Sequence, residues 1–223
     1  KSQVDHKIVN LTTDDNIRLA ATLYLPTKGG EASKHPGVVL SHQAGSDRSE
    51  WDSMAKTLAQ NGFAALTYDI RGHGQSQKVD NMRGLFGDPN RAPKDLQAAL
   101  AYLAKHKRVI SDRLAVVGSS IGGNLALAAS SREDVRTVVA LSAKTSAVKA
   151  LSGDKSLELG SAFVIASAED QGGKRAQWAK ELYKLSRNPN RLKIAEGGEH
   201  GVSLFADNPK IPRQILTWLQ KYQ

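Results

Sequence analysis

The chain has 223 residues, of which 40% are hydrophobic and 24% are charged, the balance of an ordinary soluble globular protein. It contains no cysteine, which excludes disulfides, thiolate metal sites and a cysteine nucleophile. No apolar run is long enough to cross a bilayer, so we expect no membrane-spanning helix. The length suits one domain over residues 1–223 with a substantial core.

The formal net charge is +9, and much of the excess lies late in the chain. The basic residues of this part are Lys174, Arg175, Lys180, Lys184, Arg187, Arg191 and Lys193. One interpretation is a surface for an anionic partner such as a nucleic acid. We favour the other interpretation, a solvated helix face, and therefore expect no nucleic-acid partner.

In chain order, strands alternate with helices. Two strands at 7–11 and 17–25 are predicted to form a hairpin. Further apolar segments predict strands at 37–40, 63–68, 114–117, 135–142, 163–166 and 191–195. Helices are predicted from about Ser49, at 93–104, from Ile121, to about Leu185 and at 209–219. This alternation indicates the α/β class, with a mostly parallel sheet of about eight strands and helices on both faces.

Between the strand at 114–117 and its following helix lies Gly118-Ser119-Ser120-Ile121-Gly122, a G-x-S-x-G sequence. A strand that turns directly into a helix forces the central serine into an unfavourable backbone conformation. Side chains at the flanking glycines would then collide with neighbouring backbone. We therefore predict that Ser120 is a nucleophile presented at the carboxyl edge of the sheet.

A serine hydroxyl needs a base, and histidine is the usual one because it titrates near neutral pH. His200 lies in a glycine-rich turn after the last predicted strand, so it is our candidate base. Asp170 follows the preceding strand and is the candidate carboxylate that orients the imidazole, with Glu169 as the nearest alternative. These residues follow strands whose carboxyl ends share one edge of the sheet.

The oxyanion of the reaction needs hydrogen-bond donors that are already in place. We expect one to be the backbone N–H of Ile121, at the start of the helix after the serine. The second should come from the turn after the strand at 37–40. Within that turn we favour the N–H of Ala44, with Gln43 as the alternative.

The chain resembles the α/β-hydrolases, and within them compact bacterial esterases related to dienelactone hydrolase. The resemblance rests on residues 118–122, 69–76 and 199–201, and it extends over nearly the whole chain from about residue 8. It differs at His42-Gln43, where the family usually has His-Gly, which leaves the second oxyanion donor open. Dienelactone hydrolases resemble one another in using cysteine, which this chain lacks, so their substrate is not carried over.

About 20 residues separate the strands at 135–142 and 163–166, too few for a cap domain at the place where this superfamily usually inserts one. The loop at 75–92 is the remaining candidate lid. Its Met82, Leu85 and Phe86, with His42 nearby, are predicted to line an acyl pocket. The alternative is a loop fixed in place by its own apolar side chains.

The pattern predicts a serine carboxylesterase that hydrolyses small, short-acyl esters without a metal or organic cofactor. A thioesterase or peptidase could use the same residues, and a non-catalytic binding module with a basic face is the alternative from another class. The chain begins with Lys1 rather than Met. This favours a periplasmic or secreted protein whose leader has been removed over a cytoplasmic one. The oligomeric state is not indicated.

Overall fold

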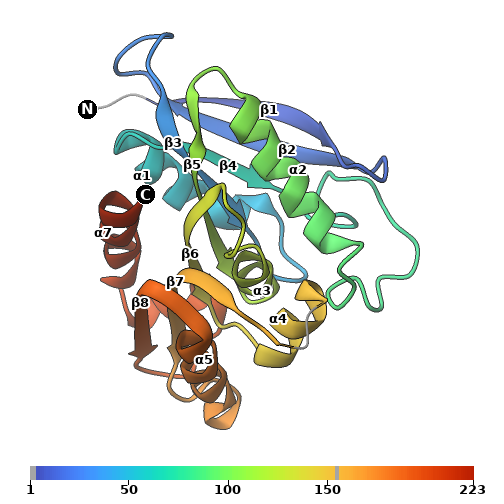
Figure 1. Ribbon diagram of the computed structural model, residues 1–223, viewed down its shortest axis with the longest axis vertical. Helices are drawn as coiled ribbons and strands as arrows, with labels where there is room; N and C mark the ends of the chain where they lie inside the picture. The colour runs from blue at the N-terminus through green and yellow to red at the C-terminus, as the bar shows by residue number, and fades with distance from the viewer. Residues whose placement is uncertain (1–3, 154–155) are drawn as a thin grey trace.

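The computed structural model describes residues 4–153 and 156–223, and its centre is one eight-stranded sheet in the order β1-β2-β4-β3-β5-β6-β7-β8 (Figure 1). The strands are β1 (Val4–Thr12), β2 (Arg18–Pro26), β3 (His35–Ser41), β4 (Ala64–Tyr68), β5 (Val109–Ser119), β6 (Val135–Leu141), β7 (Leu159–Ser167) and β8 (Ser186–Ala195). Strands β3 to β8 run parallel, and β1 and β2 form an antiparallel hairpin that joins β4. The predicted α/β class and mostly parallel sheet are confirmed.

Helices cover both faces of the sheet, because its central strands are apolar on both sides. The helices are α1 (Asp52–Gln60), α2 (Ala92–Lys105), α3 (Ile121–Ala128), α4 (Thr145–Ser152), α5 (Lys174–Leu185), α6 (Leu204–Asp207) and α7 (Ile211–Tyr222). Short 3-10 turns occur at η1 (Arg48–Trp51), η2 (Asp170–Gly173) and η3 (Gly201–Ser203). Buried side chains of α2 to α5 share one core cluster, and those of α1, α6 and α7 share the other. In Figure 1, α2, α3 and α5 cross the near face of the sheet.

Several strands are longer than the sequence pattern predicted, among them β5 and β8. β5 begins at Val109 and β8 at Ser186, and most of the added residues are exposed or half-buried and carry polar side chains. β8 is the edge strand of the sheet, so its residues need not be apolar to pair with β7. A prediction based on continuous apolar runs therefore finds only the buried end of such a strand.

The short connection between β6 and β7 contains α4, which the sequence analysis did not predict. Val148 and Leu151 anchor this helix in the core. No helix among the described residues has the length and apolar character that crossing a membrane requires.

Candidate active site

Ser120 stands between β5 and α3 in a backbone conformation with φ 55° and ψ −112°. Its N–H donates to the carbonyl of Leu141, the last residue of the neighbouring strand, at 2.7 Å. A Cβ on Gly118 would overlap the Gly122 carbonyl, and a Cβ on Gly122 would overlap the carbonyl of Ser41. Both glycines of the motif are therefore required by close packing around a strained serine.

His200 links Ser120 to Asp170 through both of its ring nitrogens. Its Nε2 lies 2.7 Å from Ser120 Oγ, and its Nδ1 lies 2.6 Å from Asp170 Oδ2. The Asp170 side chain is 8% exposed and the imidazole 36% exposed, so the line of contacts runs from a buried carboxylate to the surface. Glu169, the alternative carboxylate, has an exposed side chain. The structure thus brings together the three predicted residues and leaves Glu169 outside.

Three buried serines hold the turn that carries His200. The hydroxyls of Ser119, Ser142 and Ser167 bond the backbone of residues 199–202 at 3.2, 2.8 and 2.7 Å, respectively. Ser119 and Ser142 accept N–H groups, and Ser167 donates to a carbonyl. The sequence analysis did not single out these serines. The signal that could have found them is their position at the carboxyl ends of β5, β6 and β7.

In the turn after β3, the backbone N–H groups of Gln43 and Ala44 differ in whether they have an acceptor. The N–H of Gln43 donates to Glu50 Oε2 at 3.1 Å, so it is already engaged. Within residues 4–153 and 156–223, the N–H groups of Ala44 and Ile121 have no acceptor. The Gln43 side chain, which stands where the family usually has glycine, accepts a hydrogen bond from Ser119 Oγ at 3.0 Å and ties the turn to the serine motif.

The contribution of Glu50 to the stability of the turn after β3 depends on pH. Burial raises its pKa from 4.5 to about 7, although the hydrogen bond from the Gln43 N–H opposes the change. Because the folded-state pKa lies above the unfolded one, the unfolded chain binds fewer protons between these pH values, and this contribution to stability falls as pH rises. We expect Glu50→Gln, which keeps an oxygen acceptor, to gain stability relative to the unmodified protein between pH 5 and pH 8. Urea unfolding at both pH values measures this, and an equal difference at both would contradict it.

Two residues predicted to line the substrate pocket are fully buried. His42 is 0% exposed, accepts the N–H of Ile70 at 3.0 Å, and its Nδ1 lies 2.7 Å from the Gln43 carbonyl. Burial lowers the pKa of His42 to about 4, which keeps the ring neutral. Its role is to fix the turn after β3 to the end of β4, so its prediction as a pocket residue is wrong.

The loop at 75–92 is anchored to the core by a buried side chain. Leu85 is 0% exposed and belongs to the core on the α2 side of the sheet, so its prediction as a pocket residue is also wrong. Phe86 is half-buried beside His73, with ring centroids 5.8 Å apart, and Met82 is 41% exposed. Only Met82 and Phe86 keep surface that a substrate could touch, and their part in a pocket stays a prediction.

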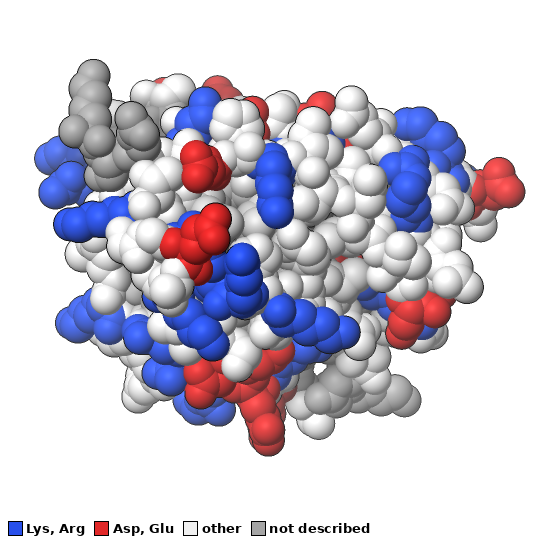
Figure 2. Space-filling model, turned by 90° about the horizontal axis from the view of Figure 1, so that it is seen from above, with Lys and Arg blue, Asp and Glu red and all other residues white. Residues whose placement is uncertain are grey.

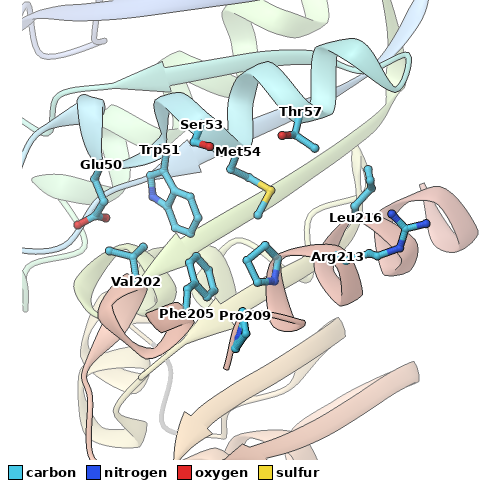
Figure 3. Close-up of a pocket in the computed structure, with 11 residues that line it drawn as sticks. Glu50, Trp51, Ser53, Met54, Thr57, Val202, Phe205, Pro209, Arg213 and Leu216 are labelled. Atoms are coloured by element: carbon cyan, nitrogen blue, oxygen red, sulfur yellow. The ribbon is translucent and has the colours of Figure 1, made fainter. Parts of the chain in front are cut away.

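An apolar cavity of about 320 Å³ lies between α1 and the segment from η3 to α7 (Figure 3). Its apolar wall consists of Trp51, Met54, Val202, Phe205, Pro209, Pro212 and Leu216. Glu50 and Val202 lie at one end and Arg213 at the other (Figure 3). The first end is therefore near both the turn after β3 and the turn that carries His200. The sequence analysis missed this cavity because its walls come from segments about 150 residues apart, each of which reads as an ordinary core-facing helix.

Most of the late basic segment is solvent-exposed. Of its seven Lys and Arg residues, only Arg175 and Lys193 are half-buried, and the other five are exposed. On the face shown in Figure 2, Lys and Arg gather mainly toward one side with Asp and Glu among them. The five exposed residues agree with a solvated surface, whereas Arg175 does not.

Known proteins share the sequence pattern and the fold. Residues 32–196 match the family described as serine aminopeptidase, S33, a stretch that contains Ser120 and Asp170. The chain is 25% identical over 221 residues to YfhR of Escherichia coli O157:H7, covering 89% of this chain and 74% of YfhR. It is 34% identical over 91 residues to a probable 2-oxo-3-(5-oxofuran-2-ylidene)propanoate lactonase of Bradyrhizobium, covering 39% of this chain and 37% of the lactonase.

The crystal structure of dienelactone hydrolase from Anabaena variabilis is similar in fold, with a TM-score of 0.76 and 20% identity over 99% of both chains. The chain spans 74% of the length of YfhR but only 37% of the length of the lactonase and of another curated relative, YcjY of Escherichia coli. The family match covers most of the chain, and the sheet carries the expected α/β order. The chain belongs to the serine aminopeptidase S33 family and has the α/β-hydrolase fold.

Proposed function

We propose that this hydrolase is a serine carboxylesterase in which Ser120 is the nucleophile, His200 the base and Asp170 the residue that orients the base. The observation that carries the proposal is the chain of two short contacts, 2.7 Å from Ser120 Oγ to His200 Nε2 and 2.6 Å from His200 Nδ1 to Asp170 Oδ2. With the proton of the neutral ring on Nδ1, facing the carboxylate, Nε2 is left free to accept the serine proton.

In the proposed reaction, Ser120 Oγ attacks the ester carbonyl while His200 Nε2 takes its proton. The new oxyanion accepts hydrogen bonds from the N–H groups of Ile121 and Ala44. The intermediate then collapses, and His200 returns the proton to the departing alcohol. Water attacks the acyl-enzyme by the same steps and releases the acid. Besides water, the proposed steps use side chains and backbone groups of the chain.

An ester is the substrate class that the comparisons favour. Two of the similar proteins, a lactonase and a dienelactone hydrolase, are named for lactones, which are cyclic carboxylic esters. The family description names an aminopeptidase, so a peptide is the rival substrate. Turnover of 4-nitrophenyl acetate, a thioacetate and an alanine 4-nitroanilide by one preparation separates these classes. Dominant anilide cleavage would replace the ester proposal by a peptidase.

The length of the acyl chain is a separate prediction. We expect kcat/KM to peak between acetyl and butyryl esters and to fall by about eight carbons, because each added CH₂ gains about 0.8 kcal/mol only where an apolar wall covers it. Of the apolar residues predicted to line the pocket, Met82 and Phe86 keep accessible surface. A series of 4-nitrophenyl esters measures this preference.

The cavity between α1 and α7 is the alternative site for an acyl chain, and it would suit a long one. A maximum at ten or more carbons would contradict the prediction and point to this cavity as the acyl site. In that case Phe205→Ala, which removes a side chain from the wall and enlarges the cavity, should change the chain-length profile. Met82→Ala on the 75–92 loop should not change it. If short esters are preferred, the effects of the two variants should be reversed.

A further inference from the structure

Arg175, near the start of α5, bonds a residue that adjoins the candidate active site. Its Nη1 donates to the carbonyl of Ser142 at 2.7 Å, and its Nε donates to Gln171 Oε1 at 2.5 Å. Ser142 directly follows Leu141, whose carbonyl accepts the Ser120 N–H. The Ser142 hydroxyl accepts the N–H of the residue after His200. The Arg175 guanidinium therefore contacts Ser142. Ser142 bonds the turn that carries His200 and directly follows Leu141, the residue bonded to the Ser120 N–H.

This guanidinium has no carboxylate partner. Among residues 4–153 and 156–223, Arg175 forms no ion pair, and its Nη2 donates to no acceptor. Asp170 acts on it electrostatically, but the Asp170 carboxylate is bonded to His200. Burial lowers the pKa of Arg175, which reflects a cation that has lost part of its hydration. A half-buried cation of this kind is usually paired with an anion.

A second cation lies beside the same aromatic ring. The Cζ atom of Arg175 is 5.2 Å from the centre of the Trp178 ring, and Nζ of Lys144 is 5.3 Å from it. Lys144 is exposed, and its backbone N–H is fixed by Asn124 Oδ1 of α3 at 2.8 Å. The Trp178 ring thus contacts two cations, and neither forms an ion pair with a carboxylate of the described residues.

The acidic side chain on the same helix is already engaged. Glu181 accepts hydrogen bonds from Thr145 at 2.7 Å and from Gln177 at 3.4 Å, through its two carboxylate oxygens. It forms no ion pair with Lys144 among the described residues. Lys144 directly precedes α4, which begins at Thr145.

We propose that Arg175 and Lys144 form a carboxylate-binding subsite beside Ser120, and that the substrate is an ester carrying a free carboxylate. This inference rests on the proposed esterase function. Arginine suits the role because its planar group can hold a carboxylate through two parallel hydrogen bonds, and the exposed lysine adds charge. The subsite explains why Arg175 stays half-buried without a carboxylate partner among the described residues.

The test compares ester pairs that differ only in charge. For a carboxylate on the acyl side, the pair is 4-nitrophenyl hemiglutarate and 4-nitrophenyl valerate. For a carboxylate on the alcohol side, it is 4-acetoxybenzoate and 4-acetoxybenzamide. We expect a higher kcat/KM for the anionic member of one pair, and the pair that shows it identifies which side of the ester faces Arg175. Equal rates within both pairs would overturn the subsite.

Variants assign the preference to residues. Arg175→Gln should lower the anionic-to-neutral ratio of kcat/KM by about 10- to 100-fold, as expected for the loss of charged hydrogen bonds. Lys144→Gln should lower the ratio less, and it serves if Arg175→Gln does not fold, because Lys144 is exposed. Lys174→Gln, an exposed cation next to Arg175, is the matched control and should leave the ratio unchanged. An equal loss on both esters would mean that Arg175 only supports the fold.

The two proposals fail separately. Hydrolysis of 4-nitrophenyl valerate that depends on Ser120, with no charge preference, would reject the subsite and keep the esterase. Absence of Ser120-dependent hydrolysis of every ester in the set would reject both.

Discussion

Ser120→Ala is expected to lower kcat for 4-nitrophenyl acetate by on the order of 10⁴-fold or more, because it removes the atom that forms the acyl-enzyme. The fold should persist, because among the described residues the Ser120 hydroxyl bonds only His200, whereas the backbone of residue 120 makes the bond to Leu141. Steady-state kinetics with far-ultraviolet circular dichroism and a urea unfolding curve measure both parts.

Ser119→Ala is the matched control, one residue away. The Ser119 hydroxyl is buried and bonds Gln43 and the N–H of Val202, so its loss should loosen the turns around the site and reduce turnover only in part. Near-complete loss of activity in Ser119→Ala, with activity retained in Ser120→Ala, would show that Ser119 is the nucleophile and contradict the assignment to Ser120.

Asp170→Asn should be nearly as severe, with a loss in kcat on the order of 10⁴-fold. An asparagine side chain can present an amide N–H to His200 Nδ1, which favours the tautomer whose Nε2 carries a proton and cannot accept one from Ser120. Glu169→Gln should change kcat by less than about twofold, because its side chain is exposed and outside these contacts. Parallel kinetics of the two variants measure this, and the reverse order of losses would assign the carboxylate to Glu169.

The fold and the three central residues were accessible from sequence because their signals are local. A branched apolar strand, two glycines around Ser120 and a small-residue helix predict the turn that the structure contains. The sequence pointed to Asp170 and His200 because each lies in the turn after a strand, and parallel strands bring such turns to one edge.

What the sequence did not reveal depends on contacts between distant segments. Leu85 reads like a lid residue, yet it packs beneath α2 in the core. Arg175 reads like one more exposed cation in a basic helix, yet it reaches across to Ser142, 33 residues earlier. The direction of a side chain at a helix start depends on which partner is available, and the local pattern of residue types does not contain that partner.

The two candidate subsites make different demands on a substrate. The cavity between α1 and α7 would favour a long apolar acyl chain, whereas Arg175 and Lys144 would favour a compact acid. A short acyl preference together with a preference for anionic esters would assign specificity to the Arg175 side of Ser120. A preference for long neutral chains would assign it to the cavity.

The most direct test of the account is covalent labelling with a fluorophosphonate, followed by peptide mass spectrometry. A fluorophosphonate reacts with a serine that a neighbouring base has activated. The account predicts one adduct, on the peptide that contains Ser120, which disappears in Ser120→Ala and is strongly slowed in His200→Ala. An adduct on another serine, or no adduct in a protein that hydrolyses 4-nitrophenyl acetate, would contradict it.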